Sequence, residues 1–262
     1  MNKILILSTA RTGTNYFIEG LNKSPETLVY TECLETSLFM MHNKKDELVR
    51  KMIGDSKKEC KLLRDEDIEE LKSLWESSHI KYWNRLWQMY TNRSTKKGIK
   101  NIGMKLFPCY LFRSNNVSID DVLPKFNKFV FIERDPLEIF YSKIKITQLH
   151  QKWMDVAIYG TDYRQKIKSY VPTSKGVTEQ WLNQWVISWI ANDLRFLKQI
   201  KKRLPHYSVI PYNEIGNKQI SEYCDFKFTD FGNYDKINYD YQDWLDSEPI
   251  FKSAYNKLIN II

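Results

Sequence analysis

The sequence predicts an α/β fold in which a mostly parallel central sheet is flanked by helices. Short apolar runs bounded by turn residues alternate with longer stretches of helical period, which is the pattern of strands joined by crossover helices. The 262-residue chain has 42% hydrophobic and 27% charged residues, as globular domains do. Since no linker-like segment divides it, we expect one domain over residues 1–262.

The expected strands are short apolar runs, beginning with KILILS near the amino terminus. Right-handed crossovers between such strands make the sheet largely parallel, with helices on both of its faces. The runs cover residues 3–8, 27–30, 99–106, 128–133 and 207–210.

The expected helices begin at residues that typically start a helix. Thr14 suits the cap of the first helix, and Pro136 suits a first helical position. Residues 34–98 and 146–178 fit the sheet least well and are interpreted as insertions. Helices are expected at residues 14–23, 65 to about 92, 136 to about 150, 178–203 and 215–224.

The net charge of +8 favours an anionic partner, either nucleic acid, an acidic membrane or a multiply phosphorylated small molecule. The densest basic cluster is Lys198 with residues 201–203, which reads as a solvated helix end. No nucleic-acid motif accompanies it, so a nucleic-acid partner is disfavoured.

The four cysteines indicate a reducing compartment, because they lie far apart with no C-x-x-C pair and no nearby histidine at ligand spacing. The apolar run at residues 4–7 is too short for a signal peptide, and no stretch approaches the length of a membrane span. We therefore expect a cytoplasmic protein without structural zinc. The cysteines are Cys33, Cys60, Cys109 and Cys224.

The segment ILILSTARTGTNYFIEGLN, residues 4–22, reads as a strand, a tight loop and a helix. Backbone N–H groups from Thr12 to Asn15 would converge at the positive end of the helix dipole, and Arg11 adds a fixed charge beside them. An ATP-binding P-loop would have lysine after Gly13, where this chain has Thr14. The segment thus favours an anion other than ATP, and an ordinary strand-to-helix turn is the alternative.

A second junction, FVFIERDPLEIFYSKIKI, repeats this design. The strand ends at Glu133, Arg134 follows, and Asp135 and Pro136 suit the start of a helix. About two helical turns then bring Ser142 back to a similar azimuth, so Arg134 and Ser142 can address one group. The alternative is a purely structural Arg-Asp-Pro turn.

Together the two segments resemble the sulfotransferases that use 3′-phosphoadenosine 5′-phosphosulfate (PAPS) and release adenosine 3′,5′-bisphosphate (PAP). The resemblance implies a P-loop-like nucleotide-binding architecture without a required metal. It implies that Arg11, Thr12, Gly13 and Thr14, with the amide of Asn15, bind the 5′-phosphosulfate. In catalysis, Arg11 would also stabilise the charge that develops on the departing phosphate. Arg134 and Ser142 match the Arg-x7-Ser motif that binds the 3′-phosphate in this family.

Weaker matches follow along the chain. SVIPYNEI, with Tyr212 and Glu214, looks like the family's late strand, and GMKLFP looks like its middle strand. The resemblance makes Lys105 the lysine that faces the sulfuryl group, although a solvent-facing lysine at a strand end is the alternative. The catalytic histidine of the cytosolic branch is absent, because Phe107 stands at its position.

Other branches, including bacterial carbohydrate sulfotransferases, place a glutamate base just after the second strand. Glu32 in LVYTECLE matches that position, with Glu35 as the second choice and a surface or capping role as the alternative. The family's carboxyl-terminal glycine-lysine loop is not evident, and Lys175 with Gly176 is a candidate for it. None of the four histidines lies in a matching motif: His42, His79, His150 and His206.

Two aromatic stripes at helical spacing are expected to bury helices against the sheet, although aromatic residues also line sugar- and lipid-binding grooves. They comprise Trp75, His79, Tyr82, Trp83, Leu86, Trp87 and Tyr90, and then Trp181, Trp185, Ile187, Trp189 and Leu194.

The resemblance therefore implies in-line sulfuryl transfer from PAPS to a hydroxyl. A carbohydrate or glycolipid is the favoured acceptor, and a phenol or a peptide tyrosine is the alternative. The insertions at residues 34–98 and 146–178 are where the acceptor is expected to be selected, since loops beyond strand ends carry specificity. Two alternatives stay open, a P-loop kinase that uses magnesium and ATP, and a nucleotide-binding protein without catalysis.

Overall fold

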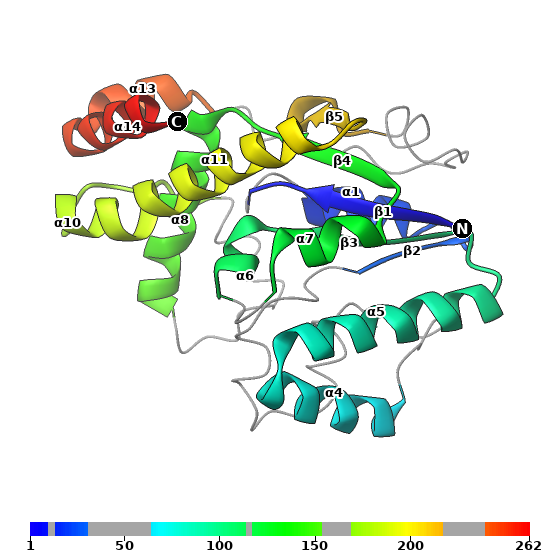
Figure 1. Cartoon of the computed structure of the whole chain (residues 1–262). Helices are drawn as coiled ribbons and strands as arrows, with labels where there is room; N and C mark the ends of the chain where they lie inside the picture. Colours follow the sequence, from blue (N-terminus) through cyan, green and yellow to red (C-terminus); the bar gives the residue numbers. More distant parts are fainter. Residues whose placement is uncertain (10–13, 31–63, 114–116, 154–168, 217–238) are drawn as a thin grey trace.

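The computed structural model describes residues 1–9, 14–30, 64–113, 117–153, 169–216 and 239–262. Its centre is a five-stranded sheet in the order β2-β3-β1-β4-β5, and every strand pairing in it is parallel (Figure 1). This confirms the α/β fold with a parallel sheet. The strands are β1 (Asn2–Leu7), β2 (Thr27–Tyr30), β3 (Asn101–Leu106), β4 (Lys128–Glu133) and β5 (Ser208–Pro211).

The strand order places β1 at a switch point. The chain runs from β1 out to the edge strand β2, returns to β3 beside β1, and then crosses to β4 on the other side of β1. In open parallel sheets, ligands bind outside the carboxyl ends of the strands where the order reverses. The carboxyl ends of β3, β1 and β4 are therefore neighbours at one edge of the sheet.

Side chains alternate between two covered faces of the sheet. Ile4 and Ile6 of β1 pack with Val130 of β4 against α1 (Thr14–Leu21). Leu5 and Leu7 point to the opposite face, where they join the larger core. That core includes residues of α5 (His79–Lys96), α6 (Pro108–Arg113), α7 (Ile119–Val122) and α11 (Ser188–Arg203), and a short 3₁₀ turn, η1 (Leu123–Lys125), follows α7.

A helical hairpin, α4 (Asp65–Ser77) and α5, replaces the single long helix expected from residue 65 to about 92. Ser78 breaks it because its backbone is extended, at φ −168° and ψ 112°, and its side chain accepts from the amide of Lys81. Both halves are amphipathic, so the pattern alone did not reveal the break. Figure 1 shows the two helices side by side, with α5 nearer the sheet.

The first aromatic stripe buries α5, as expected. Tyr82, Trp83 and Tyr90 are fully enclosed in the core. The ring of Tyr90 stacks on Tyr30 of β2 with their centroids 3.6 Å apart, which ties the hairpin to the edge of the sheet.

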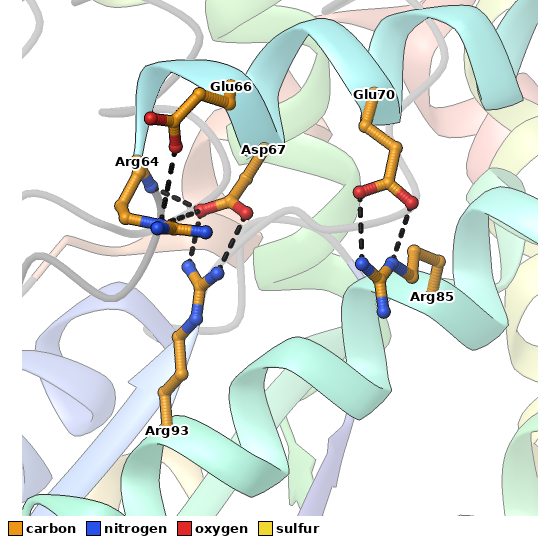
Figure 2. A network of polar contacts seen from close by, with 6 residues as sticks. All are labelled: Arg64, Glu66, Asp67, Glu70, Arg85 and Arg93. Carbon is orange, nitrogen blue, oxygen red and sulfur yellow. Dashed lines mark hydrogen bonds and ion pairs between the residues drawn. The ribbon is translucent and has the colours of Figure 1, made fainter.

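Two arginine–carboxylate pairs join the helices of the hairpin (Figure 2). The guanidinium of Arg93 on α5 forms two hydrogen bonds to the buried carboxylate of Asp67 on α4. Nearer to solvent, Nε and Nη2 of Arg85 donate hydrogen bonds to the carboxylate of Glu70 at 2.7 and 3.0 Å. The first pair is largely desolvated and the second is exposed, so they make unequal contributions to stability.

The remaining helices gather at the left of Figure 1, beyond the carboxyl ends of the strands. They share a second core built around Phe140, Trp244 and Phe251. The sequence pattern did not indicate the last two of them. The helices are α8 (Pro136–Trp153), α10 (Glu179–Leu182), α13 (Tyr241–Ser247) and α14 (Pro249–Ile261).

The helix expected at residues 178–203 forms as α10, a π turn and α11. The π turn, Asn183–Ile187, adds a residue to one turn of the helix and rotates the apolar face, so Trp185 is 55% exposed. The expectation that the second aromatic stripe is buried throughout is therefore wrong at Trp185. The helix expected at residues 215–224 lies mainly outside the described residues, and residues 215–216 are not helical.

Among the helices that the structure describes, none is long and apolar enough to cross a membrane.

Candidate anion-binding site

Several residues chosen from the sequence lie outside the described residues, and their roles stay predictions. These are Arg11, Thr12 and Gly13 of the loop, the candidate bases Glu32 and Glu35, and His42. The ends of the loop are described. Thr9 follows β1, and Thr14 opens α1 with its side chain buried, while Asn15 lies in the first turn of that helix.

Lys105 is almost completely buried, at 1% exposure, so the alternative of a solvent-facing lysine is wrong. Its partner in the parallel ladder is Ile6, and paired residues project from the same face of a sheet. Lys105 therefore lies on the face that α1 covers. Its ammonium sits 4.4 Å from the centre of the Phe107 ring.

Arg134 stands at the junction of β4 and α8, and its side chain is only 11% exposed. Its Nε donates to the carboxylate of Glu138 at 2.6 Å, and its Nη2 lies 3.4 Å from the hydroxyl of Tyr241 on α13. The guanidinium also stacks over the ring of Tyr212, 4.2 Å from its centre. An arginine held from three sides presents its charge in a fixed geometry, which suits recognition of phosphate or sulfate.

Ser142 lies on α8 as expected, two turns after Arg134, and its side chain is half-buried. Glu138 lies between them at the i+4 position of one helix face. The structure thus places a carboxylate between the two residues expected to bind one phosphate.

The described candidates converge on one side of the sheet. Tyr212 of η3 (Tyr212–Glu214) packs against the α1 face, and Arg134 is stacked on Tyr212. Thr14 at the start of α1 and Lys105 of β3 belong to the same face. The start of α1, the buried side chain of Lys105 and the guanidinium of Arg134 therefore lie on the same side of the sheet.

A cavity of about 330 Å³ opens at the carboxyl ends of β1 and β4. Thr9, which follows β1, and Arg134, which follows β4, both line it. Lys198 and Lys201 of α11 form part of its wall, and Lys201 is ion-paired with Glu133. Its apolar lining comes from Phe131, Ile132, Pro136, Ile139, Leu194, Leu197 and Ile262.

Sequence reasoning missed three features of this region. The Arg134–Glu138 pair has the i,i+4 spacing of a helical ion pair and was detectable from the sequence. Lys198 and Lys201 were recognised only as a solvated cluster, although they share a helix face. Tyr241 is 107 residues from Arg134, and no local pattern links them.

The other named residues are placed apart from this arrangement. His79 stacks on Trp75 at 3.9 Å between ring centres, and burial lowers its pKa, which favours a neutral structural imidazole. His206 is exposed. Lys175 is exposed in a turn where Gly176 has φ +76°, and the neighbouring amide of Ser174 donates to Glu248.

No protein-family model matches this chain, and no curated protein matches it in sequence. Among solved structures, the chain is similar to the sulfotransferase STF9 from Mycobacterium avium, with a TM-score of 0.42 and 11% sequence identity. The alignment covers 99% of this chain and 67% of that one. A likeness this distant does not bear on the activity, donor or site residues of this chain.

Proposed function

We propose that the protein is a sulfotransferase that moves a sulfuryl group from PAPS to a hydroxyl acceptor, with a carbohydrate or glycolipid as the favoured acceptor. The observation that carries the proposal is that Lys105 and Arg134 lie at the carboxyl ends of the two strands that flank β1, on the side of the sheet covered by α1, the helix that Thr14 opens. Separate donors at one edge suit a nucleotide that carries anionic groups at both ends.

The donor set fits PAPS chemically. Arg134, two residues before α8, and Ser142 on that helix would hold the 3′-phosphate, while Arg11 and the amides that open α1 would hold the 5′-phosphosulfate. PAPS supplies the activated sulfuryl group. Lys105 would stabilise negative charge on the sulfuryl oxygens, and its burial strengthens that interaction, because less water screens it.

Glu32 would accept the proton of the acceptor hydroxyl, a role that typically contributes about 10² to 10⁴ in rate. It follows β2, whose carboxyl end lies at the same edge as those of β1 and β3. Glu32→Gln should then lower turnover by at least about 10²-fold while PAP affinity changes little. Transfer of labelled sulfate to a panel of hydroxyl acceptors measures this, and undiminished turnover would exclude Glu32 as the base.

Calorimetric titration separates the proposal from its alternatives. Metal-independent binding of PAP, tighter than binding of ATP with magnesium, supports a PAPS enzyme. A preference for ATP with magnesium would favour a kinase and defeat the proposal. PAP binding without sulfate transfer to any acceptor in the panel would favour a nucleotide-binding protein without catalysis.

A further inference from the structure

We propose that Glu138 acts as an internal counter-anion that weakens nucleotide binding at Arg134 and so speeds nucleotide release. This inference rests on the proposed function, because it concerns the phosphate site of that nucleotide. It assigns a role to a residue that no motif singled out.

The geometry carries the inference. The carboxylate of Glu138 accepts from Nε of Arg134 at 2.6 Å, where a phosphate oxygen would otherwise bind that nitrogen. Both side chains are substantially buried, at 11% exposure for Arg134 and 30% for Glu138, so water screens their charges poorly.

An anion that reaches Arg134 has two ways to bind. It can displace Glu138 from Nε, which costs an existing charge-assisted hydrogen bond. It can instead use the terminal nitrogens of the guanidinium, which has several N–H donors, and then lies beside a like charge. In both cases the charge of Glu138 weakens anion binding at Arg134, so the expected direction of the change in affinity is the same.

The position of Glu138 means that its charge acts mainly on the 3′-phosphate of the nucleotide. Glu138 lies between Arg134 and Ser142 on α8, the two residues assigned to the 3′-phosphate. The carboxylate of Glu138 would therefore repel a product that bears a 3′-phosphate more strongly than one that lacks it. In many well-evolved enzymes, product release and not the chemical step limits turnover.

Glu138→Gln is the decisive variant. The glutamine oxygen still accepts from Nε of Arg134, so the guanidinium keeps its orientation while the negative charge disappears. Glu179→Gln makes the same change of charge at an exposed residue of α10 and serves as the matched control. PAP titration should show roughly tenfold tighter binding for Glu138→Gln, the size of one modest charge–charge interaction, and no change for Glu179→Gln.

Two further readouts separate this role from a structural one. The tighter binding should appear as slower dissociation, measured by displacement in a stopped-flow instrument. The melting temperature of Glu138→Gln should fall slightly, because the helical ion pair is lost. A residue that only stabilises α8 would lower both the melting temperature and the affinity.

Each outcome decides between the two proposals. If wild type binds PAP and Glu138→Gln binds it no more tightly, the inference is overturned while the proposed function stands. If ATP is the preferred nucleotide and Glu138→Gln tightens its binding, the proposed function fails while the counter-anion role stands. If neither protein binds either nucleotide, both fail.

Discussion

The side-chain nitrogen of Lys105 lies in a position that water hardly reaches. Moving an ammonium out of water is costly unless other groups compensate it, and buried ionisable residues are found disproportionately at functional sites. Here the lysine lies at the end of β3, beside the strand that leads into the loop before α1. Burial of this ionisable side chain at a strand end therefore favours a functional role.

Lys105→Met tests that role at the scale of one side chain. Methionine has a similar length and fills the same volume, so we expect the melting temperature to stay close to that of wild type. Sulfate transfer should fall by about 10²-fold, because one positive charge near the sulfuryl oxygens is lost. Full transfer activity in a folded Lys105→Met protein would show that the ammonium is not used.

At the scale of elements, the α4–α5 hairpin depends on the Asp67–Arg93 pair (Figure 2). Asp67→Asn leaves a partly buried guanidinium without its counter-charge and should cost about 2 to 3 kcal/mol of unfolding free energy. Glu70→Gln removes the exposed partner of Arg85 and should cost less than about 1 kcal/mol. Urea denaturation of both variants at neutral pH measures the difference, and equal costs would contradict it.

The same pair predicts a pH dependence. The hydrogen bonds from Arg93 lower the pKa of Asp67 from 3.8 to about 2. Because the folded state lowers this pKa, the stabilisation is fully present above about pH 4 and is lost as the pH falls towards 2. The stability gap between wild type and Asp67→Asn should therefore be wide at pH 6 and narrower at pH 3. A gap that stays constant over this range would contradict the assignment.

Strand β3 fits against β1 only because residue 103 is glycine. A Cβ atom there would lie 2.6 Å from the backbone oxygen of Ile4, and backbone in the middle of a sheet cannot move aside. Gly103→Ala should thus destabilise the fold by about 2 to 4 kcal/mol.

Gly98 provides the contrast for that test. Its φ is +72°, which asparagine tolerates, and no atom lies within 4 Å of an added Cβ. Gly98→Asn should cost less than about 1 kcal/mol in the same denaturation experiment. If the two variants lose similar stability, the close approach of β3 to β1 is not what requires glycine.

At the scale of the whole molecule, the proposed nucleotide site lies where the sheet and the second helical core meet. Arg134 follows the central sheet, yet it contacts Tyr241 on α13, which belongs to the second helical core. A nucleotide bound at this arginine would therefore stabilise the fold as a unit. A ligand present at 100 times its dissociation constant stabilises the native state by about 2.7 kcal/mol.

For a domain of this size, that stabilisation corresponds to a rise of about 5 to 10 °C in melting temperature. We expect PAP to produce this rise and Arg134→Ala to reduce it strongly at the same PAP concentration. Thermal denaturation with and without PAP measures both. An equal rise in the Arg134→Ala protein would place the nucleotide away from Arg134.

The sequence by itself determined the parallel α/β fold and the bounds of β4, because apolar runs and the Asp135–Pro136 start signal act locally. The same local rules located Ser142 on α8 and Arg134 just before that helix, and they contained the spacing of the Arg134–Glu138 pair. They did not locate the break at Ser78, because the apolar period continues across it.

The tertiary structure alone decided that Lys105 is buried beneath the α1 face and that Tyr241 reaches Arg134. Burial of a strand residue depends on which helix covers its face. A contact between residues 107 positions apart depends on how whole elements pack. Local patterns therefore determine where the elements lie along the chain, whereas the environment of each charge depends on the packing between distant elements.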